Sequence, residues 1–196
     1  MSKFKTVKKV GEGFFKEKGS KFLGFVYPCL SEEEAKKKLI QLRKEHNLAV
    51  HVCYAFRFGA DKKQFRASDD GEPSNSAGPP ILGQIQSFDL TNVLVAVVRY
   101  YGGTNLGVGG LVHAYRIAAK EAILNTEIID DEDKKELFIS FSYSQMPSVM
   151  KYVKGNNCQV LEQDFNEDCF LKLSYPVSNS SFLKELELIA QIQKRD

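Results

Sequence analysis

Three carboxylates fall within four residues of the segment RASDDGEPSNSAGPPILGQI, residues 66–85, as Asp69, Asp70 and Glu72. Carboxylates at this density can hold Mg²⁺ or act as general acid and general base. The glycine and proline beside them favour a turn, and solvated turn carboxylates are far commoner than catalytic ones. No fixed metal-ligand spacing accompanies them. We therefore predict no metal site here, and catalysis by these carboxylates is the minority alternative.

Five glycines separate an apolar strand from a helix in YYGGTNLGVGGLVHAYRIAAKEAI, residues 100–123. Glycines before a helix expose backbone N–H groups and a partial positive charge, which suit phosphate. The segment has neither the Lys-Ser/Thr end of a Walker A loop nor the last glycine of G-x-G-x-x-G. Positive φ and close packing explain Gly102 and Gly103 easily, but the other three glycines less well.

An anion contact is therefore slightly favoured over a purely architectural loop, and basic residues accompany it. His113, Arg116 and Lys120 share one helical face at spacings of three and four, although such a face can also be simply solvent-exposed. The nucleic-acid-binding candidates are Arg99, Gly102, Gly103, Gly107, Gly109, Gly110, His113, Arg116 and Lys120.

The alternating segment AVHVCYAFRF, residues 49–58, predicts a half-buried strand with His51, Cys53 and Arg57 on one face. A Cys–His pair can act as a nucleophile, but this spacing only places the two side by side, and no third orienting group is evident. We expect a packed cysteine beside a hydrogen-bonded histidine. His51 stays a candidate only as an acid–base partner of the carboxylates.

Composition and charge narrow the class of protein. The chain of 196 residues has a net charge of +2, with +7 in residues 1–125 and −5 in residues 126–196. This asymmetry hints that the basic half meets an anion, although solvated surface is the commoner explanation. Four scattered cysteines without a C-x-x-C pair fit a reducing cytosol. With no secretory signal and no apolar run of about 20 residues, we expect a soluble cytoplasmic protein without a membrane partner.

Hydrophobic periodicity predicts an α+β protein of two domains joined by a polar linker at residues 125–135. Ser31 and Glu34 form a capping box at the start of the first helix. Ser74, Asn75 or Ser76 is expected to cap a helix after the carboxylates. The second domain reads β-α-β-β-α, the order of a ferredoxin-like fold whose last strand is missing. The expected strands are 4–10, 21–28, 49–58, 92–101, 136–143, 158–165 and 169–176, and the other helices are 109–124, 145–156 and 179–193.

The two motifs together, ASDDGEPSNSAG and VVRYYGGTNLGVGGLVHAY, closely resemble the Impact/YigZ family over essentially the whole chain. The resemblance implies a first domain, residues 1–127, folded like the second domain of ribosomal protein S-five and domain IV of elongation factor G. It implies a ferredoxin-like second domain, residues 134–196, similar to domain V of that factor. Asn75 and Ser76 depart from the usual Gly-Thr. The matching positions are His51, Ser68, Asp69, Asp70, Gly71, Glu72, Pro73, Ala77, Gly78, Arg99, Tyr100, Gly102, Gly103, Leu106, Gly107, Gly109, Gly110 and Leu111.

For function, the resemblance implies a nucleic-acid- or ribosome-associated protein. Eukaryotic members resemble translation regulators of the amino-acid-starvation kinase pathway, largely through an extra N-terminal partner-binding domain, so we do not expect that activity here. We predict a non-enzymatic protein that binds RNA phosphate through its basic first domain, without a cofactor. No RNP-type aromatic motif is seen, so phosphate contacts should lead. The alternatives are a hydrolase using Asp69, Asp70, Glu72 and His51, and a protein-binding module acting through the acidic second domain. The lysines that extend the basic surface are drawn from Lys3, Lys5, Lys8, Lys9, Lys16, Lys18 and Lys21.

Overall fold

Two sheets, one in each half of the chain, dominate the structure, a computed structural model that describes residues 3–165 and 169–193. The chain divides into two compact units, the first formed by Phe4–Asp131 and the second by the chain from Glu132 onward together with Lys3. Each unit combines helices with an antiparallel sheet, so the expected α+β class is confirmed. No helix in the described part of the chain has the length and apolar composition needed to cross a bilayer.

The first unit is built on a five-stranded antiparallel sheet in the order β2-β3-β6-β4-β5. Its strands are β2 (Gly11–Glu17), β3 (Ser20–Pro28), β4 (His51–Phe58), β5 (Gln64–Ser68) and β6 (Val93–Tyr100). The apolar run VLVAVV places β6 at the centre, because a strand covered on both faces needs apolar side chains on both. The edge strand β5 was not predicted. Its residues are largely exposed, and its pairing with β4 defines it.

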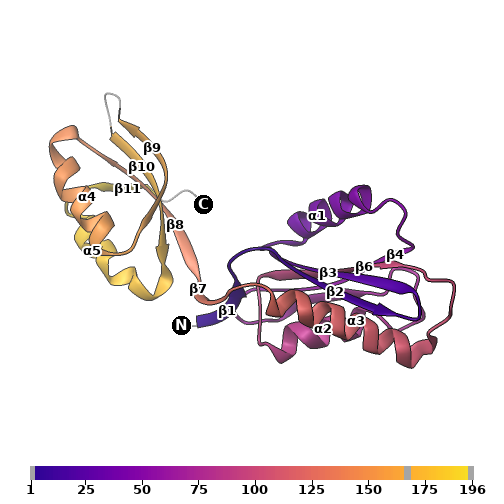
Figure 1. The fold of residues 1–196 in the computed structure, drawn as a ribbon. Helices are drawn as coiled ribbons and strands as arrows, with labels where there is room; N and C mark the ends of the chain where they lie inside the picture. Colours follow the sequence, from indigo (N-terminus) through magenta and orange to yellow (C-terminus); the bar gives the residue numbers. More distant parts are fainter. Residues whose placement is uncertain (1–2, 166–168, 194–196) are drawn as a thin grey trace. The chain divides into compact units, whose positions relative to one another are not determined.

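Helices cover both faces of this sheet (Figure 1). On one face lies α1 (Glu32–Glu45), where Leu42 packs with Val52 and Val98. On the other face lie α2 (Gly78–Ser87) and α3 (Gly107–Leu124), packed over Cys53 and other apolar side chains. The strand predicted at residues 49–58 is confirmed as β4, but it is covered on both faces and is not half-buried. The small Cys53 and Ala55 give α2 and α3 room to approach what looked like a polar face.

Local capping at α1 follows the sequence. Ser31 is the N-cap, and its Oγ accepts from the backbone N of Glu34 at 3.2 Å. The Glu34 carboxylate returns to the backbone N of Leu30 at 3.0 Å, one residue earlier than a standard capping box requires.

The predicted polar linker is partly a strand. The expected first strand, residues 4–10, ends at Val7 as β1 (Lys3–Val7), and β2 was not predicted. β1 pairs with β7 (Ile128–Glu132) in a separate two-stranded sheet. The backbone N of Lys8 donates to the carbonyl of Glu127 at 2.9 Å beside this pair. The acidic sequence of this segment has no regular spacing of apolar residues that would predict a strand. Its extended conformation therefore depends on pairing with β1, which is distant in the sequence.

The second unit has the strand order β11-β8-β10-β9. Its elements are β8 (Lys134–Phe141), the 3₁₀ turn η1 (Tyr143–Gln145), α4 (Met146–Gly155), β9 (Gln159–Phe165), β10 (Cys169–Pro176), the 3₁₀ turn η2 (Val177–Phe182), α5 (Leu183–Leu186) and β11 (Gln191–Gln193). The predicted helix 179–193 is wrong, because the chain turns after Leu186 and its last described residues pair with β8. The prediction that the last strand is missing is also wrong, because β11 completes the order β-α-β-β-α-β.

Candidate functional site

Asp69 closes the start of α2 rather than facing solvent. Its Oδ1 accepts from the backbone N of Ala77 at 2.9 Å and of Gly78 at 2.8 Å, and its Oδ2 from that of Asn75 at 2.9 Å. A carboxylate here satisfies free N–H groups and suits the positive end of the helix. The cap expected from Ser74, Asn75 or Ser76 is thus supplied from outside the helix by Asp69.

Asp70 links the same turn to β4 and α1. Its carboxylate accepts from the backbone N of Val52 at 2.6 Å and forms an ion pair with Arg43. His51 Nδ1 lies 2.7 Å from the Asp70 carbonyl and therefore donates to it. These contacts hold Asp70 in a left-handed conformation with φ of 47°.

Glu72 is the buried centre of the motif, with a side chain only 3% exposed. Its Oε1 accepts from Arg99 Nη1 at 2.6 Å and from the Tyr115 hydroxyl at 2.7 Å. His51 Nε2 lies 3.9 Å from the same oxygen. Burial raises the pKa of the Tyr115 hydroxyl well above its usual value, so that hydroxyl stays a donor.

The enzymatic alternative finds little support in this geometry. Each of the three carboxylates already accepts hydrogen bonds from other groups of the protein. The described residues contain no cluster of three or more His, Cys, Asp or Glu arranged to hold a metal ion. Cys53 donates its thiol hydrogen to the Asp69 carbonyl at 3.0 Å, and burial strongly raises the pKa of the thiol. A buried, protonated thiol is a poor nucleophile.

The five glycines of the loop divide by structural need. A Cβ on Gly102 would lie 2.0 Å from the carbonyl carbon of Gly19, so this position must be glycine. Gly103 and Gly107 have φ of 84° and 71°, which favour glycine. Gly110 is restricted only by Leu106, at 3.1 Å. A Cβ on Gly109 would meet nothing within 4 Å, so packing gives no reason for glycine there.

Helix α3 begins in this loop without a side-chain cap and without an acidic residue in its first turn. Its first residues are exposed, apart from a partly covered Gly110. The first N–H groups of a helix have no intrahelical partner, so those of α3 face the surface with a partial positive charge.

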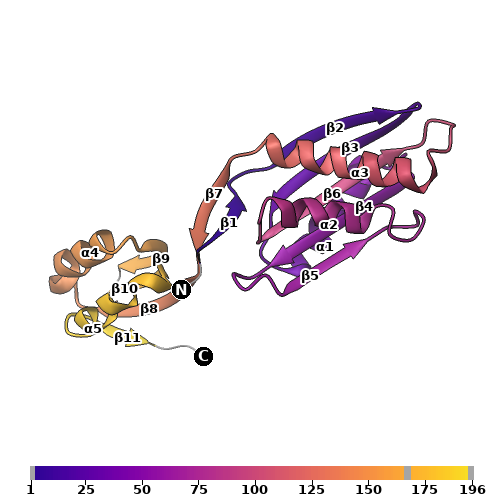
Figure 2. The ribbon, with the colours of Figure 1, turned by 90° about the horizontal axis from the view of Figure 1, so that it is seen from below.

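Basic side chains continue from this helix start along the exposed side of α3. His113, Arg116 and Lys120 are exposed along α3, with the His113 ring packed edge-on to Phe15 at 5.6 Å. Figures 1 and 2 both place the turn between β2 and β3 beside the glycine loop, where Gly19 meets Gly102. That turn brings the exposed Lys18 to the loop, whereas Lys16 and Lys21 pair across β2 and β3 and point to the face of the sheet that carries α1.

Other predicted basic residues lie elsewhere. Arg99 is 5% exposed and stacks between Phe22 and Tyr101, its guanidinium carbon 5.5 Å from each ring centre. Its charge faces Glu72, not the loop surface. Lys8 pairs with Glu127 just beyond the C-terminal end of α3, and β1 carries Lys3 and Lys5. A helix of this length separates its ends by about 27 Å, so these lysines belong to another region.

Residues 18–123, which include both motifs, match the model of the Impact N-terminal domain. The chain belongs to the IMPACT family. An IMPACT family member of Haemophilus influenzae is 35% identical over 80% of this chain and 77% of that relative. The IMPACT family member YigZ of Escherichia coli is 31% identical over 82% and 80%.

One solved structure matches the whole chain. A crystal structure of a hypothetical protein matches all of this chain and 98% of its own, with 27% identity and a TM-score of 0.73. The two-domain translational regulator Yih1 aligns over 61% of this chain and 48% of its own, with 25% identity and a TM-score of 0.39.

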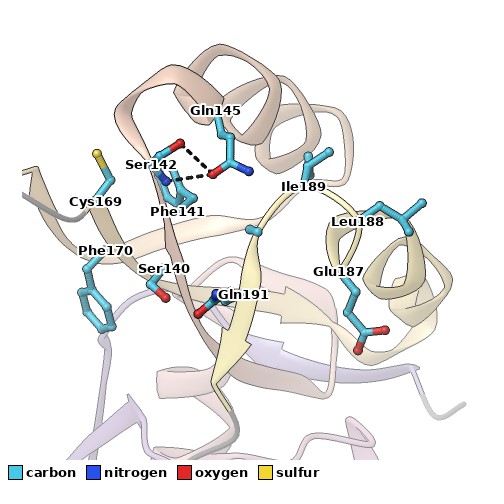
Figure 3. A pocket seen from close by; sticks show the side chains of 11 residues that line it. Ser140, Phe141, Ser142, Gln145, Cys169, Phe170, Glu187, Leu188, Ile189 and Gln191 are labelled. Atoms are coloured by element: carbon cyan, nitrogen blue, oxygen red, sulfur yellow. Dashed lines mark hydrogen bonds between the residues drawn. The ribbon is translucent and has the colours of Figure 1, made fainter.

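A hollow of about 660 Å³ lies in the second unit. Figure 3 shows it between the end of β8, the start of α4 and the turn before β11. Ser142 and Gln145 on its rim are joined by hydrogen bonds, the Ser142 backbone N donating to Gln145 Oε1 at 2.8 Å.

Sequence reasoning missed Tyr115 and Arg43, the partners of Glu72 and Asp70. Tyr115 lies three residues after the apolar Val112 and directly before Arg116. This helical spacing is the same as that of an ordinary aromatic residue buried in a core. Only a polar hydroxyl on a buried helix face hints that it needs a hydrogen-bond partner.

Proposed function

We propose that this chain is a non-enzymatic translation regulator that binds RNA phosphate with the loop surface, defined as Gly107–Gly110 together with Lys18, Arg116 and Lys120. The observation that carries the proposal is Gly109, a glycine that neither packing nor positive φ requires, in the first turn of an exposed, uncapped helix. A glycine there leaves the backbone N–H groups open to close approach by an oxyanion.

The charges around this helix start support an anion. Within the described part of the chain, no salt bridge joins the three cations of the loop surface to a carboxylate. They therefore add their field to that of the helix start instead of being neutralised locally. Phosphate contacts position a nucleic acid without reading its sequence, so RNA in general, including that of the ribosome, is the target class.

Salt dependence of RNA binding tests the proposal. Each phosphate contact to single-stranded nucleic acid contributes about 0.7 to the slope of log affinity against log salt. Replacing Lys18 and Arg116 with Ala should therefore lower the slope for oligouridine by about 1.4, and equally for an unrelated sequence. Fluorescence anisotropy across a salt series measures both.

The matched control removes two exposed lysines from α1, on the opposite face of the sheet, as Lys36→Ala with Lys44→Ala. This variant has the same net charge and should keep the wild-type slope. If both double variants lose the same slope, only the net charge matters, and the loop surface is not the binding site. Arg99 is left out of the test because its replacement would leave Glu72 buried without its cation.

A further inference from the structure

Tyr101 exposes an aromatic ring in the loop that leads from β6 into α3. This tyrosine is 49% exposed and is followed by Gly102, Gly103, Thr104 and Asn105, which are small or polar and are exposed as well. Single exposed apolar side chains are common, so exposure alone assigns no role to the ring. Its fixed position and its neighbours, however, point to a ligand.

Two contacts hold the ring in place without any ligand. The Tyr101 hydroxyl donates to Asn105 Oδ1 at 3.1 Å, and the guanidinium carbon of Arg99 lies 5.5 Å from the ring centre. Arg99 is itself buried against Glu72, so it supports the ring on its inner face. The opposite face and the edges of the ring therefore account for the exposed half of Tyr101. A ring held in this way loses little conformational freedom when a second planar group stacks on it.

The ring lies in the same loop as the uncapped start of α3. Asn105, which accepts from the Tyr101 hydroxyl, precedes Gly107 by two residues, so the Cα atoms of Asn105 and Gly107 are at most about 8 Å apart. Gly107–Gly110 are the residues whose backbone N–H groups bind phosphate in the proposed function. A nucleotide that places its phosphate there can reach the tyrosine ring with its base.

A cation from the turn between β2 and β3 accompanies the ring. The backbone N of Gly102, the residue after Tyr101, donates to Ser20 Oγ at 3.1 Å, and Gly102 packs directly against Gly19. Lys18 precedes Gly19 in this turn and is exposed. An aromatic ring with a lysine and the positive end of a helix nearby suits a nucleotide, which joins a planar base to an anionic phosphate.

We propose that Tyr101 stacks on an unpaired base of a single-stranded RNA whose phosphate binds the start of α3. The proposal rests on the proposed function of the loop surface and narrows its target from RNA in general to single-stranded segments. In duplex RNA the bases are stacked inside the helix and are not available to a side chain. Because every base has a π-face, stacking tolerates any sequence, so Tyr101 adds affinity without reading one.

Two substitutions at Tyr101 separate the ring from the hydroxyl. Tyr101→Leu removes the ring and should weaken oligouridine binding about fivefold or more, the lower end of the effect for a base stacked on an aromatic side chain. Tyr101→Phe keeps the ring and should retain most of the affinity. Fluorescence anisotropy at one salt concentration measures the affinities of the full chain, and circular dichroism verifies that each variant folds.

Changes in the nucleic acid test the same contact from the other side. An abasic oligomer, which has the sugar–phosphate chain of oligouridine without its bases, should bind the wild type and Tyr101→Leu equally, and so should duplex RNA. Oligomers that contain 2-aminopurine report stacking directly, because a stacked ring quenches the fluorescence of this base. We expect quenching by the wild type and by Tyr101→Phe, and its loss with Tyr101→Leu.

Phe65→Leu is the matched control, because Phe65 is 55% exposed but lies at the far end of the sheet. Phe65 is opposite Arg57, which is opposite Val93 at the start of β6, so more than about 20 Å separates it from Tyr101. This variant should leave oligouridine binding unchanged. Equal losses in Phe65→Leu and Tyr101→Leu would overturn the proposal.

A folded Tyr101→Leu variant that binds oligouridine as the wild type does would also overturn it. If Lys18→Ala with Arg116→Ala still lowers the salt slope in that case, the phosphate site stands and only the stacking is wrong. If neither the two cations nor the ring affects binding, the stacking and the phosphate site are both wrong.

Discussion

Among single residues, Glu72 has the contacts with the largest consequence for stability. Its buried carboxylate has one cationic partner, Arg99, and one hydroxyl donor, Tyr115. Removing one partner of a buried ion pair typically costs about 3–5 kcal/mol, because the remaining charge is left in the interior. We therefore expect Arg99→Met to lower the free energy of unfolding by about that amount, and Tyr115→Phe by about 1.5–3 kcal/mol. Urea denaturation followed by circular dichroism measures both.

Arg116→Met is the control on the same helix as Tyr115, since its side chain is exposed and its loss should change stability by no more than about 0.5 kcal/mol. Wild-type stability in Arg99→Met would contradict the structural role and return Arg99 to the candidate phosphate contacts. The same reasoning applies to Asp69, because Asn can replace only part of its three backbone contacts. Loss of RNA binding in Asp69→Asn therefore has to be separated from loss of fold.

The thiol of Cys29 makes stability depend on alkaline pH. Burial raises its pKa from an ordinary 9.0 to about 11. Because the folded state holds the proton more tightly than the unfolded state, this stabilisation is complete below pH 9 and is lost as pH rises toward 11. Cys29→Ala removes the titrating group, so its unfolding free energy should fall less steeply over this range. Identical pH profiles for the two proteins would show that Cys29 does not contribute.

At the level of elements, variants at the start of α3 distinguish a role of its glycines in anion binding from a purely structural role. Gly109→Ala should stabilise the helix by up to about 1 kcal/mol, since the added Cβ meets no neighbour. Gly109→Val should also fold, but its branched side chain should crowd a phosphate at the N–H groups and weaken oligouridine binding severalfold. Thermal melting and anisotropy on the same samples measure the two effects.

Gly102→Ala is the contrasting variant, because its Cβ would collide with the Gly19 backbone and should lower the melting temperature instead. If Gly109→Val binds RNA as the wild type does, the loop is a turn with no role in binding.

Elements with local signals could be predicted from the sequence, and elements that depend on a distant partner could not. Helix α1 begins at Ser31 and β6 lies at the sheet centre, as capping and apolar patterning predict. The strands β5, β7 and β11 are short or polar and exist because β4, β1 and β8 pair with them. The candidate site follows the same rule. The carboxylate turn and the exposed basic face of α3 could be located, but the burial of Arg99 against Glu72 depends on packing that no spacing reveals.

For the whole molecule, the strand pairing at the junction of the two units determines how readily a protease cuts the chain there. A polar linker at residues 125–135 should be cut readily, whereas a β7 strand paired with β1 must first open locally. We expect glutamyl endopeptidase to cleave the native chain slowly at Glu127 and Glu132. Thr6→Pro removes a backbone donor from β1 and should raise that cleavage about tenfold, which corresponds to about 1.4 kcal/mol of lost pairing when opening is fast. Glu32→Pro, at the first position of α1 where proline is tolerated, is the matched control and should leave the rate unchanged. Mass spectrometry of timed digests identifies the cut sites, and rapid cleavage of the native chain between Glu127 and Asp133 would mean that β7 does not protect the junction.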